Sequence, residues 1–301
     1  DPVFTIPDLL IHLHKNVQSK RKTSDVMKGE EMNALIAAFP DDDGNAKEKF
    51  KLTVLRGLNR KYGITEEDFH ASELSLVPVM GPRHVGIDAS MIGGAGQDDG
   101  ICSFAAARAL GAVDGIPPST AAIALFDKEE IGSNGPTGAR SSWLHHVMND
   151  LMLRAGIDDR SKNLNRCLEK VKVLSADVTA ALDPTFKSVH DPKSAAVLGK
   201  GIAIMKYTGY GGKIGANDAS GRHMAFLGEI FSRNGVPFQV TSLGAVDAGG
   251  GGTIAKYISE SFNCDVVDAG PSLLNMHSPF EISHVADLHA TWKGFKVFLE
   301  S

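Results

Sequence analysis

From about residue 100 to its end, the chain alternates short apolar runs with amphipathic segments, and this alternation constrains the fold more than any other feature. The predicted strands are 120–128, 171–178, 201–208, 236–243 and 264–270. The predicted helices are 102–113, 141–155, 159–170, 221–235, 253–263 and a closing helix from about 282. Strands that alternate with helices of this length indicate an α/β fold with a mixed, largely parallel sheet flanked by helices.

The first 82 residues lack this alternation. A helix is predicted over 29–39, a solvated loop follows at DDDGNAKEK, and the runs LTVLRGL and LSLVPVM have the composition of strands. The glycine and proline of MGPRH interrupt the pattern. We therefore expect two domains, 1–82 and 83–301.

Composition argues against several classes of function. The formal net charge is −5, the pI is near 6.1, and the sequence has no basic stripe of the kind that binds nucleic acid. No apolar run approaches the roughly 20 residues that cross a bilayer, and the N-terminal residues lack a signal-peptide pattern. Cys102, Cys167 and Cys264 are widely spaced, which fits a reducing compartment rather than a disulfide framework. We expect a cytoplasmic protein.

Acidic residues and one histidine stand where predicted strands end or helices begin. They are Asp98, Asp99, Glu129, Glu130, Asp177 and His277. Ligands of open α/β sheets bind beyond the carboxyl ends of the strands, so these side chains are expected to meet at one edge of the sheet. Taken singly, each has an ordinary alternative as a helix cap, a surface charge or a solvated loop histidine. The prediction therefore rests on the combination.

This set of ligands points to a pair of divalent metal ions that share one carboxylate. Zinc accepts carboxylate oxygen and imidazole nitrogen, and a metal pair lowers the pKa of a shared water. A further carboxylate that binds no metal must then move the proton of that water to the leaving amine. Glu129 and Glu130 are neighbours at one strand end, so one can bind metal while the other transfers the proton.

The segment GAVDAGGGGTIAKY, from Gly244, predicts a strand end, a glycine loop and a helix start, where free backbone N–H groups can face an anion. Nucleotide binding is one interpretation, but the segment has neither the GK[ST] of a P-loop nor the spacing of a dinucleotide fingerprint. A purely structural tight turn is another. In a peptidase, the loop would hold the substrate backbone or a tetrahedral oxyanion.

Four segments in this order, GQDDGICSF, ALFDKEEIGSNGPTGA, SADVTAALDP and NMHSP, resemble the aspartyl-aminopeptidase and vacuolar aminopeptidase I family of dinuclear zinc peptidases. The resemblance covers essentially the whole chain, including TIPDLLIHL near its start. It implies a metalloaminopeptidase that cleaves the N-terminal peptide bond with a water activated by two zinc ions, for which cobalt or manganese can substitute. By position, Asp98 would bridge the metals and Glu129 would be the general base. Glu130 and His277 would bind one zinc, and Asp177 the other.

The family fold adds a smaller β-rich dimerisation domain, to which residues 1–82 would partly correspond. Members form dimers and tetrahedral dodecamers, so the implied partners are peptide substrates and further copies of the chain, with no nucleic acid and no membrane. The segment IHL resembles a stretch in which a histidine reaches the active site of a neighbouring subunit. His12 is therefore a candidate substrate contact, and a histidine on an apolar helix face is the alternative.

The sequence departs from the family pattern in two ways. The family has a further metal-binding histidine in an HxD motif ahead of the dimerisation insertion, and none of the 11 histidines here, His84 included, stands in that context. We expect a shortened sequence of an active enzyme, with a catalytically incomplete fragment or a non-catalytic assembly subunit as the alternative. Members that prefer acidic residues carry a lysine in the region resembling KIGANDASGR, where Gly215 is the nearest position and Lys213 is nearby. This favours a neutral or broad residue preference.

Overall fold

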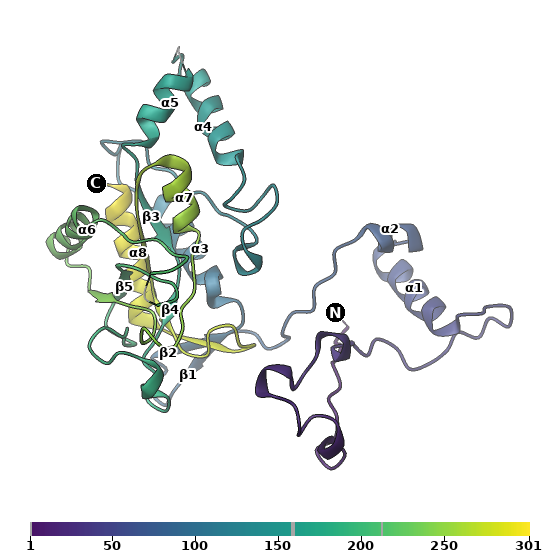
Figure 1. Cartoon of the computed structure of the whole chain (residues 1–301). Helices are drawn as coiled ribbons and strands as arrows, with labels where there is room; N and C mark the ends of the chain where they lie inside the picture. Colours follow the sequence, from purple (N-terminus) through teal and green to yellow (C-terminus); the bar gives the residue numbers. More distant parts are fainter. Residues whose placement is uncertain (1, 158–159, 212) are drawn as a thin grey trace. The chain divides into compact units, whose positions relative to one another are not determined.

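The computed structural model describes residues 2–157, 160–211 and 213–301. The chain divides into two compact units, Asp1–Val79 and Met80–Ser301 (Figure 1). The dimerisation role expected for residues 1–82 remains a prediction. Within the described residues, no helix is both long enough and apolar enough to cross a bilayer.

In its described residues, 2–79, unit 1 contains helices and turns and no extended strand; its one β pairing is the bridge between Thr5 and Leu35. Its elements are η1 (His14–Asn16), η2 (Thr23–Asp25), η3 (Gly29–Glu31), α1 (Lys49–Tyr62) and α2 (Glu66–Ala71). Gly63 ends α1 in the left-handed conformation, with φ 71°, that favours glycine. The β-rich character expected for this part of the chain is therefore not met in these residues.

Three predictions within unit 1 are wrong. The run LTVLRGL lies inside α1, because its leucines Leu52, Leu55 and Leu58 recur at helical spacing and are partly buried. The helix predicted over 29–39 is reduced to η3. Ile36 and Phe39 are 53 % and 83 % exposed, so the apolar face that would stabilise a helix is not packed. The run LSLVPVM is also irregular and exposed rather than paired as a strand.

Unit 2 is built on a mixed sheet of four described strands in the order β3-β7-β5-β6. The strands are β3 (Lys172–Ala176), β5 (Ile202–Met205), β6 (Phe238–Thr241) and β7 (Asp265–Gly270). The β3–β7 and β5–β6 pairs are parallel, and the β5–β7 pair is antiparallel. The predicted α/β fold with a mixed, largely parallel sheet flanked by helices is confirmed.

Helices cover both faces of this sheet. One face packs against α3 (Gln97–Leu110), α6 (Gly221–Arg233) and α8 (Val285–Leu299), and the other against α5 (Arg160–Leu168) and α7 (Ala255–Phe262). Neighbouring residues of β7 alternate between the faces: Val267 belongs to the first core cluster and Val266 to the second. A strand that is buried on both faces reads as a continuous apolar run, which is why CDVVDAG was predictable.

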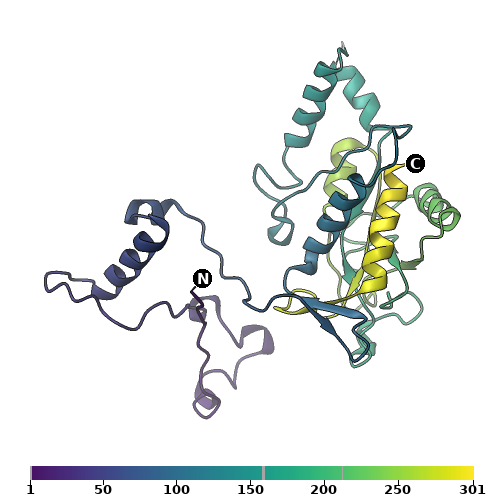
Figure 2. The same cartoon turned by 180° about the vertical axis from the view of Figure 1, so that it is seen from behind.

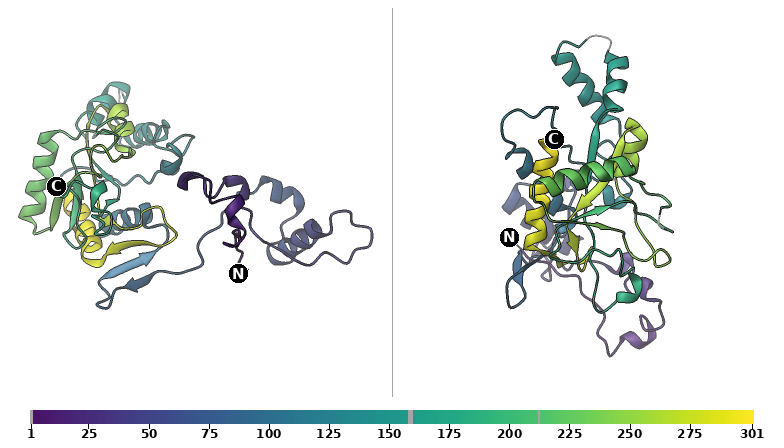
Figure 3. Two further views of the ribbon diagram at one scale, coloured as in Figure 1. Left: turned by 60° about the horizontal axis from the view of Figure 1, so that its bottom comes forward. Right: turned by 90° about the vertical axis from the view of Figure 1, so that its left-hand side faces the viewer.

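The helices α3 and α8 lie side by side (Figure 2). Small buried residues such as Ala105 and Ala290 allow this close approach. In Figure 3, α6 (green) crosses α8 (yellow). Gly294 of α8 lies at this crossing, where a Cβ would come within 3.2 Å of the Phe231 ring of α6, closer than ordinary van der Waals contact.

A second, antiparallel sheet joins β1 (Arg83–Val85), β2 (Met91–Gly94) and β9 (Glu281–His284). It was not predicted, because β9 occupies residues assigned to the start of the closing helix, which begins at Val285 instead. The short parallel pair of β4 (Thr179–Ala180) and β8 (Ser272–Leu273) continues beyond β3 and β7. These short elements carry the loops of the candidate site.

The strand predicted over 120–128 is absent from the described structure, where residues 120–126 are irregular. An apolar run becomes a strand only when a neighbouring strand satisfies its backbone N–H and C=O groups. In the described residues no strand pairs with this segment, and Leu125 is 59 % exposed. The helix that follows, α4 (Trp143–Arg154), lies within the range predicted for it, 141–155.

Candidate functional site

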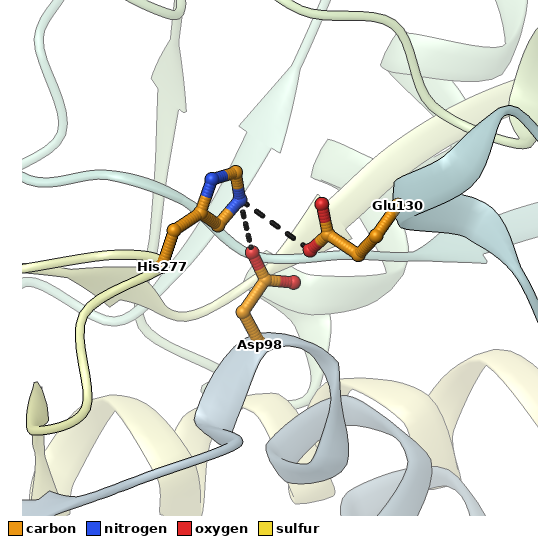
Figure 4. Close-up of side chains that lie close together, drawn as sticks. All are labelled: Asp98, Glu130 and His277. Atoms are coloured by element: carbon orange, nitrogen blue, oxygen red, sulfur yellow. Dashed lines mark ion pairs between the residues drawn. The ribbon is translucent and has the colours of Figure 1, made fainter. Parts of the chain in front are cut away.

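Side chains from three distant segments meet in unit 2: Asp98, Glu130 and His277 (Figure 4). The His277 imidazole Nε2 lies 3.0 Å from Asp98 Oδ2 and 3.4 Å from Glu130 Oε1. Each residue offers one ligand atom, and these atoms lie within 4.8 Å of one another. One metal ion can contact all three.

A second group of possible ligands contains Asp98, Asp99 and Asp177, again with ligand atoms within 4.8 Å of one another. Asp98 therefore belongs to both groups. A carboxylate has two oxygens and can bind a metal through each, so this arrangement suits two neighbouring metal ions that share Asp98.

Asp98 and Asp99 lie in the first turn of α3, which follows β2 through Gly96 in the left-handed conformation (φ 70°). Both aspartates have non-helical backbone angles, so the helix is kinked where they stand. The buried Glu281 carboxylate accepts hydrogen bonds from the backbone N–H groups of Gln97 (2.6 Å) and Asp98 (3.0 Å). These contacts fix the start of α3 against β9.

Glu129 and Glu130 form the 3-10 turn η4 (Glu129–Ile131). The turn is flanked by Lys128 and Ser133, whose φ angles of 68° and 58° are unusual for residues other than glycine. The Ser133 N–H donates to the Lys128 carbonyl at 2.7 Å and closes the loop. Such backbone angles cost roughly 1–3 kcal/mol each and concentrate at functional sites.

Asp177 directly follows β3, and its Oδ1 accepts a hydrogen bond from the Val178 N–H at 2.8 Å. His277 lies in the loop between β8 and β9 and also has a positive φ, 65°. Its N–H donates to Glu281 Oε1 at 2.8 Å. The ring itself is 62 % exposed and faces Asp98 and Glu130.

Burial and neighbouring negative charges raise the pKa values of four carboxylates at this site. Burial, followed by the charge of Glu130, raises the pKa of Asp98 to about 6, although His277 acts in the opposite direction. Burial also raises the pKa of Asp99 to about 8. Burial, then the charge of Asp99, holds the pKa of Asp177 well above its usual range, and burial followed by Glu130 raises the pKa of Glu129. Bound cations would favour the ionised carboxylates in place of protons.

An unpartnered oxygen atom also supports metal binding by these residues. Asp99 Oδ1 is buried and has no hydrogen-bond partner within the described part of the chain, which is unusual for a buried polar atom. Carboxylate oxygens together with one imidazole nitrogen suit zinc. The residues therefore fit a pair of divalent ions.

The structure does not bring all of the candidate residues into these two groups. Glu129 lies next to Glu130 but belongs to neither group. His12 is exposed in a turn of unit 1, and its role at the site remains a prediction. The loop after Gly244 packs closely, since a Cβ at Gly250 would lie 2.0 Å from the Gly209 carbonyl oxygen. This supports the structural-turn interpretation at that glycine.

Sequence reasoning gave no role to three residues of the site. Asp99 was noticed only as the neighbour of Asp98. Asp268 is fully buried in β7, where burial raises its pKa to about 6, and its charge contributes to the raised pKa of Asp177. An aspartate inside the apolar run CDVVDAG was a signal that could have drawn attention to it. Glu281 had no comparable signal, because its hydrogen bond from the Gln97 N–H joins residues 184 positions apart in the sequence.

A sequence profile of the family described as aminopeptidase I zinc metalloprotease (M18) matches residues 1–299. The chain belongs to the M18 family. The resemblance inferred from its four segments is thereby confirmed. Among M18 proteins, it is 46 % identical over 300 residues to a probable M18 family aminopeptidase 1 of Thermotoga maritima, covering 100 % of this chain and 65 % of the relative. It is 43 % identical over 301 residues to the corresponding protein of Clostridium acetobutylicum, covering 100 % and 64 %.

Solved structures of M18 proteins share the fold. The crystal structure of the T. maritima M18 aminopeptidase matches with a TM-score of 0.93 at 46 % identity, over 100 % of this chain and 65 % of that one. Aminopeptidase I from C. acetobutylicum matches with a TM-score of 0.87 at 41 % identity, over 100 % and 64 %. The M18 chain described here thus spans about two thirds of the length of the relatives it matches.

Proposed function

We propose that this protein is a metalloaminopeptidase that removes the N-terminal residue of peptides with a water activated by two zinc ions. The observation that carries the proposal is the position of Asp98, which belongs to both groups of possible ligands. A carboxylate shared by both groups would allow two metal ions to lie close together, as they do in two-metal hydrolases. Membership of the M18 family, whose description is a zinc metalloprotease, supports the same chemistry.

Each residue has a distinct task in this proposal. Asp98 would be shared by the two metal sites. Glu130 and His277 would complete one, and Asp177 would contribute to the other, where Asp99 lies within reach. Zinc ions, when bound, lower the pKa of a water molecule toward neutrality and polarise the carbonyl of the scissile bond. Cobalt or manganese can replace them in the same oxygen and nitrogen ligand set.

Glu129 acts as the general base. It stands beside Glu130 at the site but outside both ligand groups, so its carboxylate is free to accept the proton of the attacking water. Burial and the charge of Glu130 raise its pKa, which brings a carboxylate closer to the range useful for proton transfer at neutral pH. The same group then delivers the proton to the amine that leaves as the peptide bond breaks.

The proposal extends to self-association and location. A solved structure described as the S. cerevisiae mApe1 dodecamer shares the fold at 22 % identity, with a TM-score of 0.65 over 89 % of this chain and 60 % of that one. We expect this protein to form dimers through residues 1–82 and to assemble into a tetrahedral dodecamer, with His12 contacting substrate across subunits. We also expect a neutral or broad preference for the N-terminal residue of the substrate, and a cytoplasmic location.

The test is turnover of a panel of aminoacyl p-nitroanilides by protein that has been stripped with a chelator and reloaded with zinc, cobalt or manganese. We expect release of p-nitroaniline only after metal is added, and none from Asp98→Asn treated in the same way. Peptides blocked at their N-terminus should not be cleaved. A protein that binds two zinc ions and still turns over no substrate would contradict the proposed activity and favour an assembly subunit of the same fold.

A further inference from the structure

Glu281 is a buried acid that no part of the proposed reaction uses. It opens β9, and only 2 % of its surface is exposed. Within the described part of the chain, no lysine or arginine forms an ion pair with it. Burying an ionised carboxylate is costly unless hydrogen bonds compensate it, so its partners indicate what it is for.

Those partners are backbone N–H groups of the two segments that carry metal ligands. Oε2 accepts from Gln97 at 2.6 Å and Asp98 at 3.0 Å, while Oε1 accepts from His277 at 2.8 Å. Hydrogen bonds from N–H groups to a carboxylate are roughly twice as strong as those between neutral groups. One side chain therefore joins the start of α3 to the loop that carries His277.

Glu281 is itself held firmly. Its residue pairs with Gly94 in the β2–β9 ladder, and its backbone carbonyl accepts a hydrogen bond from Gln97 Nε2 at 2.7 Å. Gln97 in turn donates to the Ile92 carbonyl at 3.1 Å and accepts from Ser283 Oγ at 2.5 Å. The carboxylate is thus anchored to the small sheet from which α3 departs.

We propose that Glu281 is a positioning residue that sets the separation of Asp98 and His277 before metal binds. It touches neither substrate nor metal. The proposal rests on the proposed function in one respect, since it assumes that these two residues are metal ligands. Groups that orient metal ligands commonly account for about 10- to 100-fold in metal affinity.

The change that tests this is Glu281→Gln, which keeps the size of the side chain. A glutamine has one acceptor oxygen and one NH₂ donor. The glutamine oxygen can accept hydrogen bonds either from the N–H groups of Gln97 and Asp98 or from that of His277. Its NH₂ group then faces the remaining backbone N–H and cannot accept a hydrogen bond from it. The variant therefore releases one of the two segments while leaving the rest of the core unchanged.

Asp287 provides a matched control. It is also fully buried and also accepts two backbone hydrogen bonds, from Gly199 at 2.8 Å and Gly201 at 2.7 Å. Neither partner belongs to a segment that carries a candidate ligand. Asp287→Asn should therefore cost comparable stability without disturbing the positions of Asp98 and His277.

The experiment measures zinc affinity by competition with a chromophoric chelator for the wild type and both variants. We expect Glu281→Gln to bind zinc about 10- to 100-fold more weakly, and Asp287→Asn to bind it as the wild type does. Wild-type affinity in Glu281→Gln, or equal weakening in both variants, would overturn the positioning role.

Amide hydrogen exchange of the wild type keeps the proposal testable if Glu281→Gln does not fold. The N–H groups of Asp98 and His277 should exchange slowly although neither donates to another backbone group in a regular helix or strand. Exchange at the rate of an open loop would contradict the proposal. A wild type that binds no zinc would instead contradict the proposed function, and the exchange measurement alone would then decide whether Glu281 holds the two segments.

Discussion

The imidazole of His277 lies 3.0 Å from the carboxylate of Asp98, although the two residues come from opposite ends of unit 2. Asp98 arrives at the start of α3 and His277 on the loop after β8. The backbone N–H groups of both residues donate hydrogen bonds to the Glu281 carboxylate, so one buried side chain contacts both segments. Asp98 is also within reach of Asp177, which makes it the residue on which both candidate metal sites depend.

Replacing Asp98 should therefore affect both sites, whereas replacing Asp177 should affect one. We expect Asp98→Asn to lose nearly all tightly bound zinc and Asp177→Asn to lose about half, because Glu130, His277 and Asp98 remain to hold one ion. Elemental analysis of dialysed protein gives the zinc content per chain. Equal losses in the two variants would argue against a bridging role for Asp98.

Glu129 and Glu130 are adjacent residues with different expected roles, so each serves as the control for the other. Glu129→Gln should retain zinc and lower kcat by roughly 10²- to 10⁴-fold, the usual contribution of a general base. Glu130→Gln should lose zinc together with activity. The measurements are zinc content and p-nitroanilide turnover on the same samples. A Glu129→Gln protein with full kcat would remove Glu129 from the mechanism.

The fold of unit 2 could be predicted from sequence where burial produces a recognisable pattern of apolar residues along the chain. The strands β5 and β7 are buried on both faces and read as apolar runs, whereas β3 and β6, the outer strands of the described sheet, are only partly buried. Helix α6 begins directly after Ser220, whose hydroxyl caps the helix by accepting a hydrogen bond from the His223 N–H. The residues 120–128 have the same apolar character, but no strand among the described residues pairs with them. Composition could not distinguish the two cases.

The candidate site, too, could be predicted only in part from the sequence. Chain position suggested that Asp98, Glu130 and His277 would lie near one another, because each stands at the end of a predicted element, and the structure brings these three together. The contact between Glu281 and the backbone of Asp98 has no local signature. It joins residues far apart in the sequence through backbone N–H groups, which every residue except proline has. Such contacts become visible only once the chain is folded.

Gly270 should be required for the position of Asp177. A Cβ at Gly270 would lie 2.1 Å from the Asp177 carbonyl oxygen and 2.8 Å from Cys102 Sγ, so Gly270→Ala must push the end of β3 away. We expect a loss of about 1–3 kcal/mol in the free energy of unfolding, as overpacking typically causes, together with weaker zinc binding. Urea unfolding of the metal-free protein measures the first effect and chelator competition the second.

Gly228 is the matched control for that change. It lies inside α6, and a Cβ there would meet nothing closer than the Phe238 ring at 3.8 Å. Gly228→Ala should therefore stabilise the protein by about 0.5–1 kcal/mol, because alanine loses less backbone entropy in a helix. If Gly270→Ala were tolerated as well as Gly228→Ala, the close approach at Asp177 would not be rigid.

As the pH rises from about 4 to about 8, Asp98 and Asp99 should make the metal-free protein less stable. The folded-state pKa of Asp98 is raised from 3.8 to about 6 and that of Asp99 to about 8, chiefly by burial. Between pH 3.8 and these folded pKa values, the folded chain binds more protons than the unfolded chain. The two protonated aspartates therefore contribute their full stability below pH 3.8, and this contribution is lost as the pH rises through the folded pKa values. Added zinc should therefore raise the melting temperature more at pH 8 than at pH 6.

The variant Asp99→Asn isolates this effect, because an amide cannot ionise in the buried site. In metal-free protein at about pH 8 it should be more stable than the wild type by on the order of 2–4 kcal/mol, a gain of several degrees in melting temperature.

Asp265 is the control with the opposite sign. Its hydrogen bond with Arg222 lowers its pKa, so Asp265 stabilises the fold above pH 3.8 and Asp265→Asn should lower the melting temperature at neutral pH. Melting curves of chelator-treated protein across this pH range test both signs, and a wild type whose stability rose steadily toward pH 8 would show that the site does not hold its carboxylates as buried, mutually repelling groups.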